Sequence, residues 1–141
     1  MRVRVRADYK SRITDGRWHQ GITPLEDYFV IGVNLDEYRV VDDKGEPILY
    51  PKVLFAVLDA RVPPDWQFTE DGDGGFYLDP IRTARPGFYE DFFNSDGNKI
   101  AQVETQTILR EVLEATKVSV SDEDHPLIER ALKRLPRPSK P

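Results

Sequence analysis

The chain has 141 residues, no cysteine and a formal net charge of −5 at pH 7. This length suits one domain with a buried core, and the lack of cysteine excludes disulfides, thiolate nucleophiles and cysteine-bound metals. No apolar run approaches the roughly 18 residues of a membrane helix, and residues 1–4 lead into no signal-peptide core. We therefore expect a cytoplasmic protein with no membrane partner.

The charged residues are distributed unevenly along the chain. Residues 1–20 carry six Lys/Arg and two Asp (+4), residues 65–96 carry eight acids and two Arg (−6), and residues 130–141 carry five Lys/Arg and no acid (+5). The two ends are therefore basic and the middle is acidic. Such segments point to different partners, since an acidic surface suits a basic protein and basic segments suit nucleic acid.

The first segment alternates between arginine and small apolar residues from Arg2 to Ala7. A period of two places Val3 and Val5 on one face of a strand and the arginines on the other. The arginines are either a ladder for phosphate groups or the solvated face of a first sheet strand that discourages edge pairing. We favour the second interpretation, with a long loop at residues 15–21 after this strand.

Four further apolar runs follow in quick succession, at residues 28–33, 38–41, 48–50 and 53–58. Turn-forming residues separate them, and Gly45 is free to adopt a positive φ. A meander of such short strands must close or be covered to protect its edges, so residues 1–60 are predicted to form a small β-barrel. We expect its core to include Tyr28, Val30, Tyr38, Val40, Leu54 and Phe55.

The same stretch contains a longer pattern of residues. It reads Tyr28-x-Val30-x-x-Val33, Tyr38-Arg39-Val40, Asp42-Asp43-x-Gly45-Glu46 and Tyr50-Pro51-x-x-x-Phe55-x-Val57. This pattern resembles small bacterial proteins with a Src-homology-3-like barrel, which include immunity proteins of polymorphic toxin systems, the antidotes encoded beside secreted toxins. The resemblance implies such a barrel and a role in binding a toxin. It does not imply recognition of proline-rich peptides, because the signature of signalling Src-homology-3 domains is not evident.

Residues 61–98 are predicted to be a loop-rich acidic part. Residues 70–75 have the acid and glycine content of a calcium loop, but counting from Asp71 places Gly75 at position five and Arg82 at position twelve, where ligands are required. A glycine-rich hairpin leading into a strand at residues 76–78 is the better interpretation. Residues 86–94 are predicted to form a short helix with an aromatic stripe.

The C-terminal part is predicted to be helical. Residues 99–117 carry an apolar stripe of helical period, although residues 99–108 contain Thr and Val and a strand there stays open. A second helix is predicted to follow Ser121, with Pro126 in its first turn, and residues 136–141 are expected to be a flexible tail. The fold class is therefore α+β, one domain over residues 1–135, with helices 99–135 packed beside the barrel.

The sequence offers no arrangement typical of catalysis. His19 and His125 are about a hundred residues apart, and none of the common nucleophile, zinc-protease or phosphate-loop motifs occurs. We therefore expect no enzyme activity, no metal and no cofactor.

The function predicted from the sequence is that of an immunity protein that binds a cognate toxin. An acidic surface suits the basic active-site cleft of a toxin that acts on nucleic acid or nucleotides. A non-catalytic, nucleic-acid-associated barrel is the alternative, although the negative net charge makes it less favoured, and a purely structural domain is a third. The candidate anchors and steering charges for the partner are Trp66, Glu70, Asp71, Asp73, Phe76, Tyr77, Glu90 and Asp91; alternatively, these aromatics belong to a satellite core and these acids only keep the surface soluble.

Overall fold

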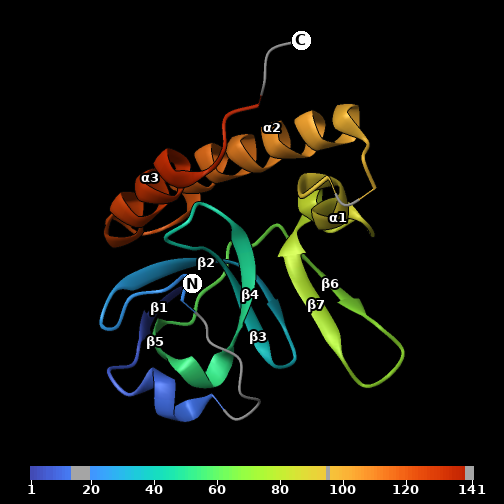
Figure 1. The fold of residues 1–141 in the computed structure, drawn as a ribbon. Helices are drawn as coiled ribbons and strands as arrows, with labels where there is room; N and C mark the ends of the chain where they lie inside the picture. The colour runs from blue at the N-terminus through green and yellow to red at the C-terminus, as the bar shows by residue number, and fades with distance from the viewer. Residues whose placement is uncertain (14–19, 95, 139–141) are drawn as a thin grey trace.

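The computed structural model describes residues 1–13, 20–94 and 96–138, which form an α+β fold (Figure 1). The strands are β1 (Arg2–Val5), β2 (Asp27–Asn34), β3 (Glu37–Val41), β4 (Pro47–Pro51), β5 (Phe55–Asp59), β6 (Trp66–Glu70) and β7 (Phe76–Pro80). The helices are α1 (Phe88–Phe92), α2 (Lys99–Thr116) and α3 (His125–Arg134). Short 3-10 turns are η1 (Tyr9–Arg12), η2 (Lys52–Leu54), η3 (Ile81–Thr83), η4 (Lys117–Ser119) and η5 (Asp122–Asp124).

All strands pair antiparallel, in the order β4–β3–β2–β1–β5. The end of β2 also pairs with β7, through Val33 with Leu78 and Asn34 with Tyr77, and β7 pairs with β6. Within the described residues β4 and β5 do not pair with each other. The predicted α+β class is therefore confirmed. The sheet is open, so the predicted closure of residues 1–60 into a barrel is not confirmed.

Strand β2 is buried on both faces, because its apolar side chains alternate between two separate cores. Tyr28 and Val30 lie in the first core, with residues of β1, β3 and β5. Phe29 and Ile31 lie in the second core, which the helices cover. Helices α2 and α3 lie across this side of the sheet in Figure 1. The six predicted core residues are confirmed, with exposed fractions from 0% to 8%.

The turn between β3 and β4 fastens the sheet to helix α3. Asp42 is 2% exposed; one carboxylate oxygen accepts two backbone N–H groups of its own turn, and the other accepts the Tyr50 hydroxyl at 2.7 Å. Asp43 accepts a hydrogen bond from Arg134 at 3.1 Å. Gly45 has a φ of +78°, and a Cβ there would lie 1.9 Å from the carbonyl oxygen of Arg134. Only glycine therefore lets the helix end approach this turn.

The other predicted elements are largely confirmed. The glycine-rich hairpin is β6–β7, the short aromatic helix is α1, and residues 99–116 are helical along their whole length. A strand at residues 99–108 is wrong: Asn98 caps the helix, and the hydroxyls of Thr105 and Thr107 donate to carbonyls four residues back, so these residues satisfy their polar groups within the helix. Most of the predicted loop around His19, and the last three residues of the predicted tail, lie outside the described residues.

Truncation of Phe55 tests the first core. Phe55 is 3% exposed and meets Tyr38 edge to face, with ring centroids 5.9 Å apart. We expect Phe55→Ala to lower the free energy of unfolding by about 3–5 kcal/mol, because truncation leaves a cavity. The matched control is Val57→Ala on the same strand, 46% exposed, which should cost less than about 1 kcal/mol. Equal effects of the two variants in urea unfolding would contradict this core assignment.

Candidate functional site

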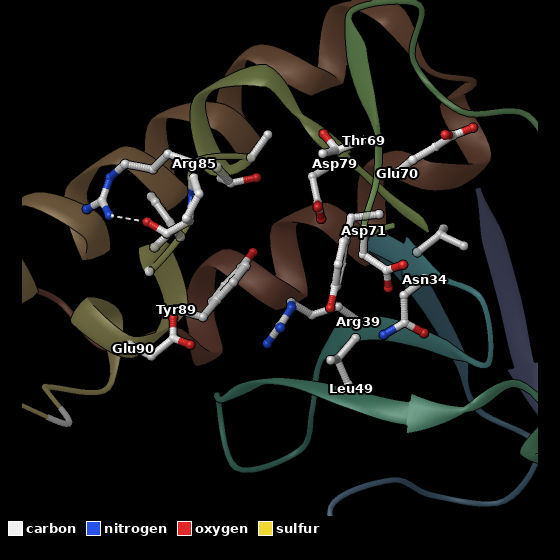
Figure 2. A pocket seen from close by; sticks show the side chains of 17 residues that line it. Asn34, Arg39, Leu49, Thr69, Glu70, Asp71, Asp79, Arg85, Tyr89 and Glu90 are labelled. Carbon is white, nitrogen blue, oxygen red and sulfur yellow. Dashed lines mark hydrogen bonds between the residues drawn. The ribbon is translucent and has the colours of Figure 1, made fainter. Parts of the chain in front are cut away.

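A pocket of about 510 Å³ lies where the β6–β7 hairpin meets β3 and helix α1 (Figure 2). Its inner wall includes Arg39, Asp79 and Tyr89, which lie on three different elements. Acidic side chains surround it, from both the hairpin and α1. This combination of a cavity with partly buried charged groups makes it the leading candidate site of the described chain.

The strand geometry explains how these residues meet. On β3, Tyr38 and Val40 point into the first core, so Arg39 points to the opposite side. On β7, Asp79 lies over β2 at Gly32, where a Cβ atom would be 2.5 Å from its carboxylate oxygen. The small residue on β2 therefore allows the carboxylate to lie against the sheet.

Arg39 is held by two contacts. Its guanidinium lies over the Tyr89 ring, 3.7 Å from the centroid, and its Nη1 donates to the carbonyl of Pro47 at 2.7 Å. Burial lowers the pKa of Arg39, whereas the neighbouring Tyr89 and Asp79 oppose this shift. An arginine nevertheless stays protonated, so the pocket contains a fixed positive charge.

Asp79 is the least exposed of the acids that line the pocket, and it lacks a partner in the described chain. Within the described residues its carboxylate makes no hydrogen bond and no ion pair, although the charge of Arg39 is near enough to act on it. Burial raises the pKa of Asp79 to about 6, and Arg39 works against this increase. At neutral pH the pocket therefore contains a partly buried carboxylate with no partner among the described residues.

The hydroxyl of Tyr89 is a second polar group of the pocket that lacks a partner in the described chain. Its hydroxyl is buried and makes no hydrogen bond of normal geometry within the described residues; the Thr83 hydroxyl beside it donates instead to the Pro80 carbonyl at 3.1 Å. Burial raises the pKa of Tyr89, so the phenol is neutral at physiological pH. Figure 2 shows the Asp79 carboxylate and the Tyr89 hydroxyl directed toward the same space.

The structure brings only some of the eight predicted site residues together. Those that line the pocket are Glu70, Asp71, Tyr77 and Glu90. Asp91 lies beside the pocket, since it pairs at 2.8 Å with Arg85 of the wall. Asp73 and Phe76 lie along a separate hollow of about 240 Å³ at the hairpin turn. Trp66 is elsewhere, half-buried beside Val112 of α2.

Three residues of the inner wall were not predicted as site residues: Arg39, Asp79 and Tyr89. The pattern of β3 does place Arg39 away from the core. No local signal in the sequence, however, indicates that α1 and β7 cover it. An acid inside an otherwise apolar strand run, as Asp79 is among Phe76–Leu78 and Pro80, was the only available indication.

Asp79→Asn tests the unpaired carboxylate through stability. An unfolded Asp has a pKa of about 3.9, so between about pH 4 and pH 6 the unfolded chain loses this proton while the folded chain keeps it. The free energy of unfolding of the parent should therefore fall as pH rises through that window. After allowance for partial exposure, Asp79→Asn should be about 1–2 kcal/mol more stable than the parent at about pH 7.5 and equal to it near pH 4.

The control for this comparison is Glu90→Gln, an exposed acid of the same pocket. It should leave the free energy of unfolding unchanged at both pH values. Urea unfolding of the three proteins measures the effect. A stability difference for Asp79→Asn that does not depend on pH would contradict the desolvated carboxylate.

Comparisons with known proteins add no relative to this description: no protein-family model, no curated protein and no solved structure matches the chain. In the part of the chain that the structure describes, no group of three or more His, Cys, Asp or Glu could hold a metal ion. No helix there is long and apolar enough to cross a membrane. The site is therefore characterised by its own geometry, an acid-lined pocket in which the partly buried Asp79 carboxylate has no partner among the described residues.

Proposed function

We propose that the chain is a protein-binding inhibitor, an immunity protein that neutralises a bacterial toxin through the β6–β7 hairpin and the pocket beside it. The observation that carries the proposal is the exposure of this hairpin. It joins the rest of the sheet through only two residue pairs, at the end of β2. Figure 1 shows it projecting beside the main sheet, away from α2 and α3.

The hairpin presents aromatic side chains on both of its faces. Phe68 is 58% exposed and stacks on Phe76, with ring centroids 5.5 Å apart. Tyr77 is 48% exposed and lies on the opposite face, toward the pocket. Exposed aromatic groups supply most of the binding energy in many protein interfaces. Phe68 was not among the predicted anchors, because its strand could not be told from a loop.

The acids near the hairpin turn are available to a partner. Glu70 and Asp73 are exposed and, within the described residues, form no ion pair or side-chain hydrogen bond. Asp71 differs, since its Oδ1 accepts the backbone N–H groups of Asp73 and Gly75 and thereby shapes the turn. Free negative charges on a projecting element increase the rate of association with a basic partner.

The order of the first five strands supports the proposed Src-homology-3-like relationship. The residue pattern that carries the resemblance lies on β2 to β5, and these strands with β1 follow the order β4–β3–β2–β1–β5, with the 3-10 turn η2 between β4 and β5. The likeness is to the path of the chain, because the sheet itself stays open.

Several arginines near both ends have intramolecular partners, which speaks against the nucleic-acid alternative. Those of the first segment bond to Glu123 and Asp124 (Arg2), to Asp27 (Arg4) and to the carbonyl of Phe55 (Arg6). Those of α3 bond to Glu26 (Arg130) and Asp43 (Arg134). A phosphate would have to displace these groups before it could bind.

We therefore predict weak nucleic-acid binding. At physiological salt the dissociation constant for duplex DNA or RNA should be no tighter than about 10⁻⁵ M, as for non-specific contacts. Fluorescence anisotropy with labelled duplexes measures it. Sub-micromolar affinity that is lost when Arg2, Arg4 and Arg6 are replaced by Gln would contradict the proposed function and favour the alternative.

The proposed function itself predicts a toxin gene beside the gene for this chain, and protection of cells that co-express the two. A triple variant with Glu70, Asp73 and Glu90 changed to Lys should slow association with the purified toxin at least about tenfold, since it reverses free charges near the contact surface. A matched triple variant on α2, with Glu104, Glu111 and Glu114 changed to Lys, produces the same change in net charge and should associate like the parent. Biolayer interferometry and growth assays measure the two effects. Absence of a neighbouring toxin, or full protection by the Lys variant, would contradict the proposal.

A further inference from the structure

We propose that the pocket between β7 and α1 binds the guanidinium group of an arginine side chain from the protein partner, with the carboxylate of Asp79 as its principal contact. The choice of a partner's arginine as the source rests on the proposed function. The guanidinium chemistry does not, because it follows from the groups that line the pocket.

The nitrogen-bearing side chains of the pocket wall are already engaged, whereas the Asp79 carboxylate is not engaged by any described residue. Asn34 donates to Glu37 at 3.1 Å, Arg85 donates to Asp91 at 2.8 Å, and Arg39 is held by the Pro47 carbonyl and the Tyr89 ring. Each of these three side chains therefore has at least one partner. The Asp79 carboxylate has none within the described residues. An occupant that offers several N–H donors would complete the site.

The charge of the lining also selects a cation. Four acids and two arginines line the pocket, which gives a formal charge of −2. The positive group of Arg39 faces the Tyr89 ring at 3.7 Å and is not ion-paired with Asp79. An incoming cation can therefore pair with Asp79 while the acids Glu70 and Glu90 attract it from the pocket mouth.

A guanidinium fits these surroundings better than an ammonium. Its planar fork can give two parallel N–H bonds to the Asp79 carboxylate. Tyr77, 48% exposed on the same wall, offers a ring face for stacking, whereas one face of the Tyr89 ring is already covered by Arg39. A volume of about 510 Å³ leaves room for the group and the stem of its side chain.

An unpaired buried carboxylate is unfavourable for folding. At neutral pH a bound cation removes this cost, because it gives the Asp79 carboxylate charge-assisted hydrogen bonds. The same carboxylate that weakens the free chain would strengthen a complex. This pairing of a stability cost with an unused charge is typical of functional positions.

The experiment titrates the ¹⁵N-labelled full chain with Nα-acetyl-arginine amide and follows backbone shifts by NMR. The matched ligand is Nα-acetyl-citrulline amide, which replaces the guanidinium with a neutral ureido group of the same shape. We expect saturable shifts around Asp79 and Tyr77, with a dissociation constant on the order of 1 mM for so small a ligand. Citrulline amide should bind at least about tenfold more weakly.

Variants connect the binding to the proposed contact. Asp79→Asn should weaken binding of the arginine amide at least about tenfold, and Tyr77→Ala about threefold through loss of stacking. Glu104→Gln, an exposed acid of α2 remote from the pocket lining, is the matched control and should bind like the parent. The backbone spectrum of each variant reports whether it is folded.

The possible outcomes are decisive. No saturable binding at about ten times the expected dissociation constant, equal binding of citrulline amide, equal binding of Nα-acetyl-lysine amide, or unchanged binding by folded Asp79→Asn would each overturn the guanidinium pocket. Because no toxin is present, the two proposals fail separately. Binding of the arginine amide without protection of cells would refute the immunity function alone, and protection without such binding would refute the pocket alone.

Discussion

Strand β2 must be buried on both of its faces, and the rest of the structure depends on this constraint. Its alternate side chains enter two cores, one closed by the neighbouring strands and the other by the helices. A slip of one residue would exchange two apolar sets, so hydrophobicity alone does not fix the register. The polar end of Tyr28 does: its hydroxyl donates to Asp43 at 2.7 Å and accepts the Thr23 N–H at 2.9 Å. Only the observed register places that hydroxyl at the polar turn.

The candidate site follows from the same strand. Strand β2 is longer than its pairing with β1, and its last two residues are left to pair with β7. So short a pairing attaches the β6–β7 hairpin without merging it into the main sheet. Helix α1 then covers the space between hairpin and β3, which becomes the pocket. The buried charges of Arg39 and Asp79 are thus a consequence of how the hairpin is attached.

The sequence predicts the local elements well because their signals are local. Alternation, turn residues and helical period locate β2 to β5, the glycine-rich hairpin and α2. What the sequence could not predict depends on tertiary docking. Arg39, Asp79 and Tyr89 are separated by ten to fifty residues, and nothing near any of them indicates that the others lie opposite. Closure of the barrel was expected from the need to protect strand edges, but here the helices and the hairpin cover part of the sheet instead.

The distribution of ion pairs separates the chain into two electrostatic regions. Near the termini, arginines bond to acids remote in the sequence: Arg2 of β1 to Asp124 of η5, and Arg130 of α3 to Glu26 just before β2. These contacts use the basic charge of both ends inside the molecule. On the hairpin, by contrast, Glu70 and Asp73 are unpaired within the described residues, and the Asp79 carboxylate beneath them is unpaired as well. Unpaired acids also occur elsewhere among the described residues, such as Glu46 in the β3–β4 turn and Glu104 on α2. On the hairpin, however, three of them lie on one projecting element together with exposed aromatic side chains. A basic partner that docks there can approach several of these acids at once, and this grouping is the physical ground for expecting such a partner.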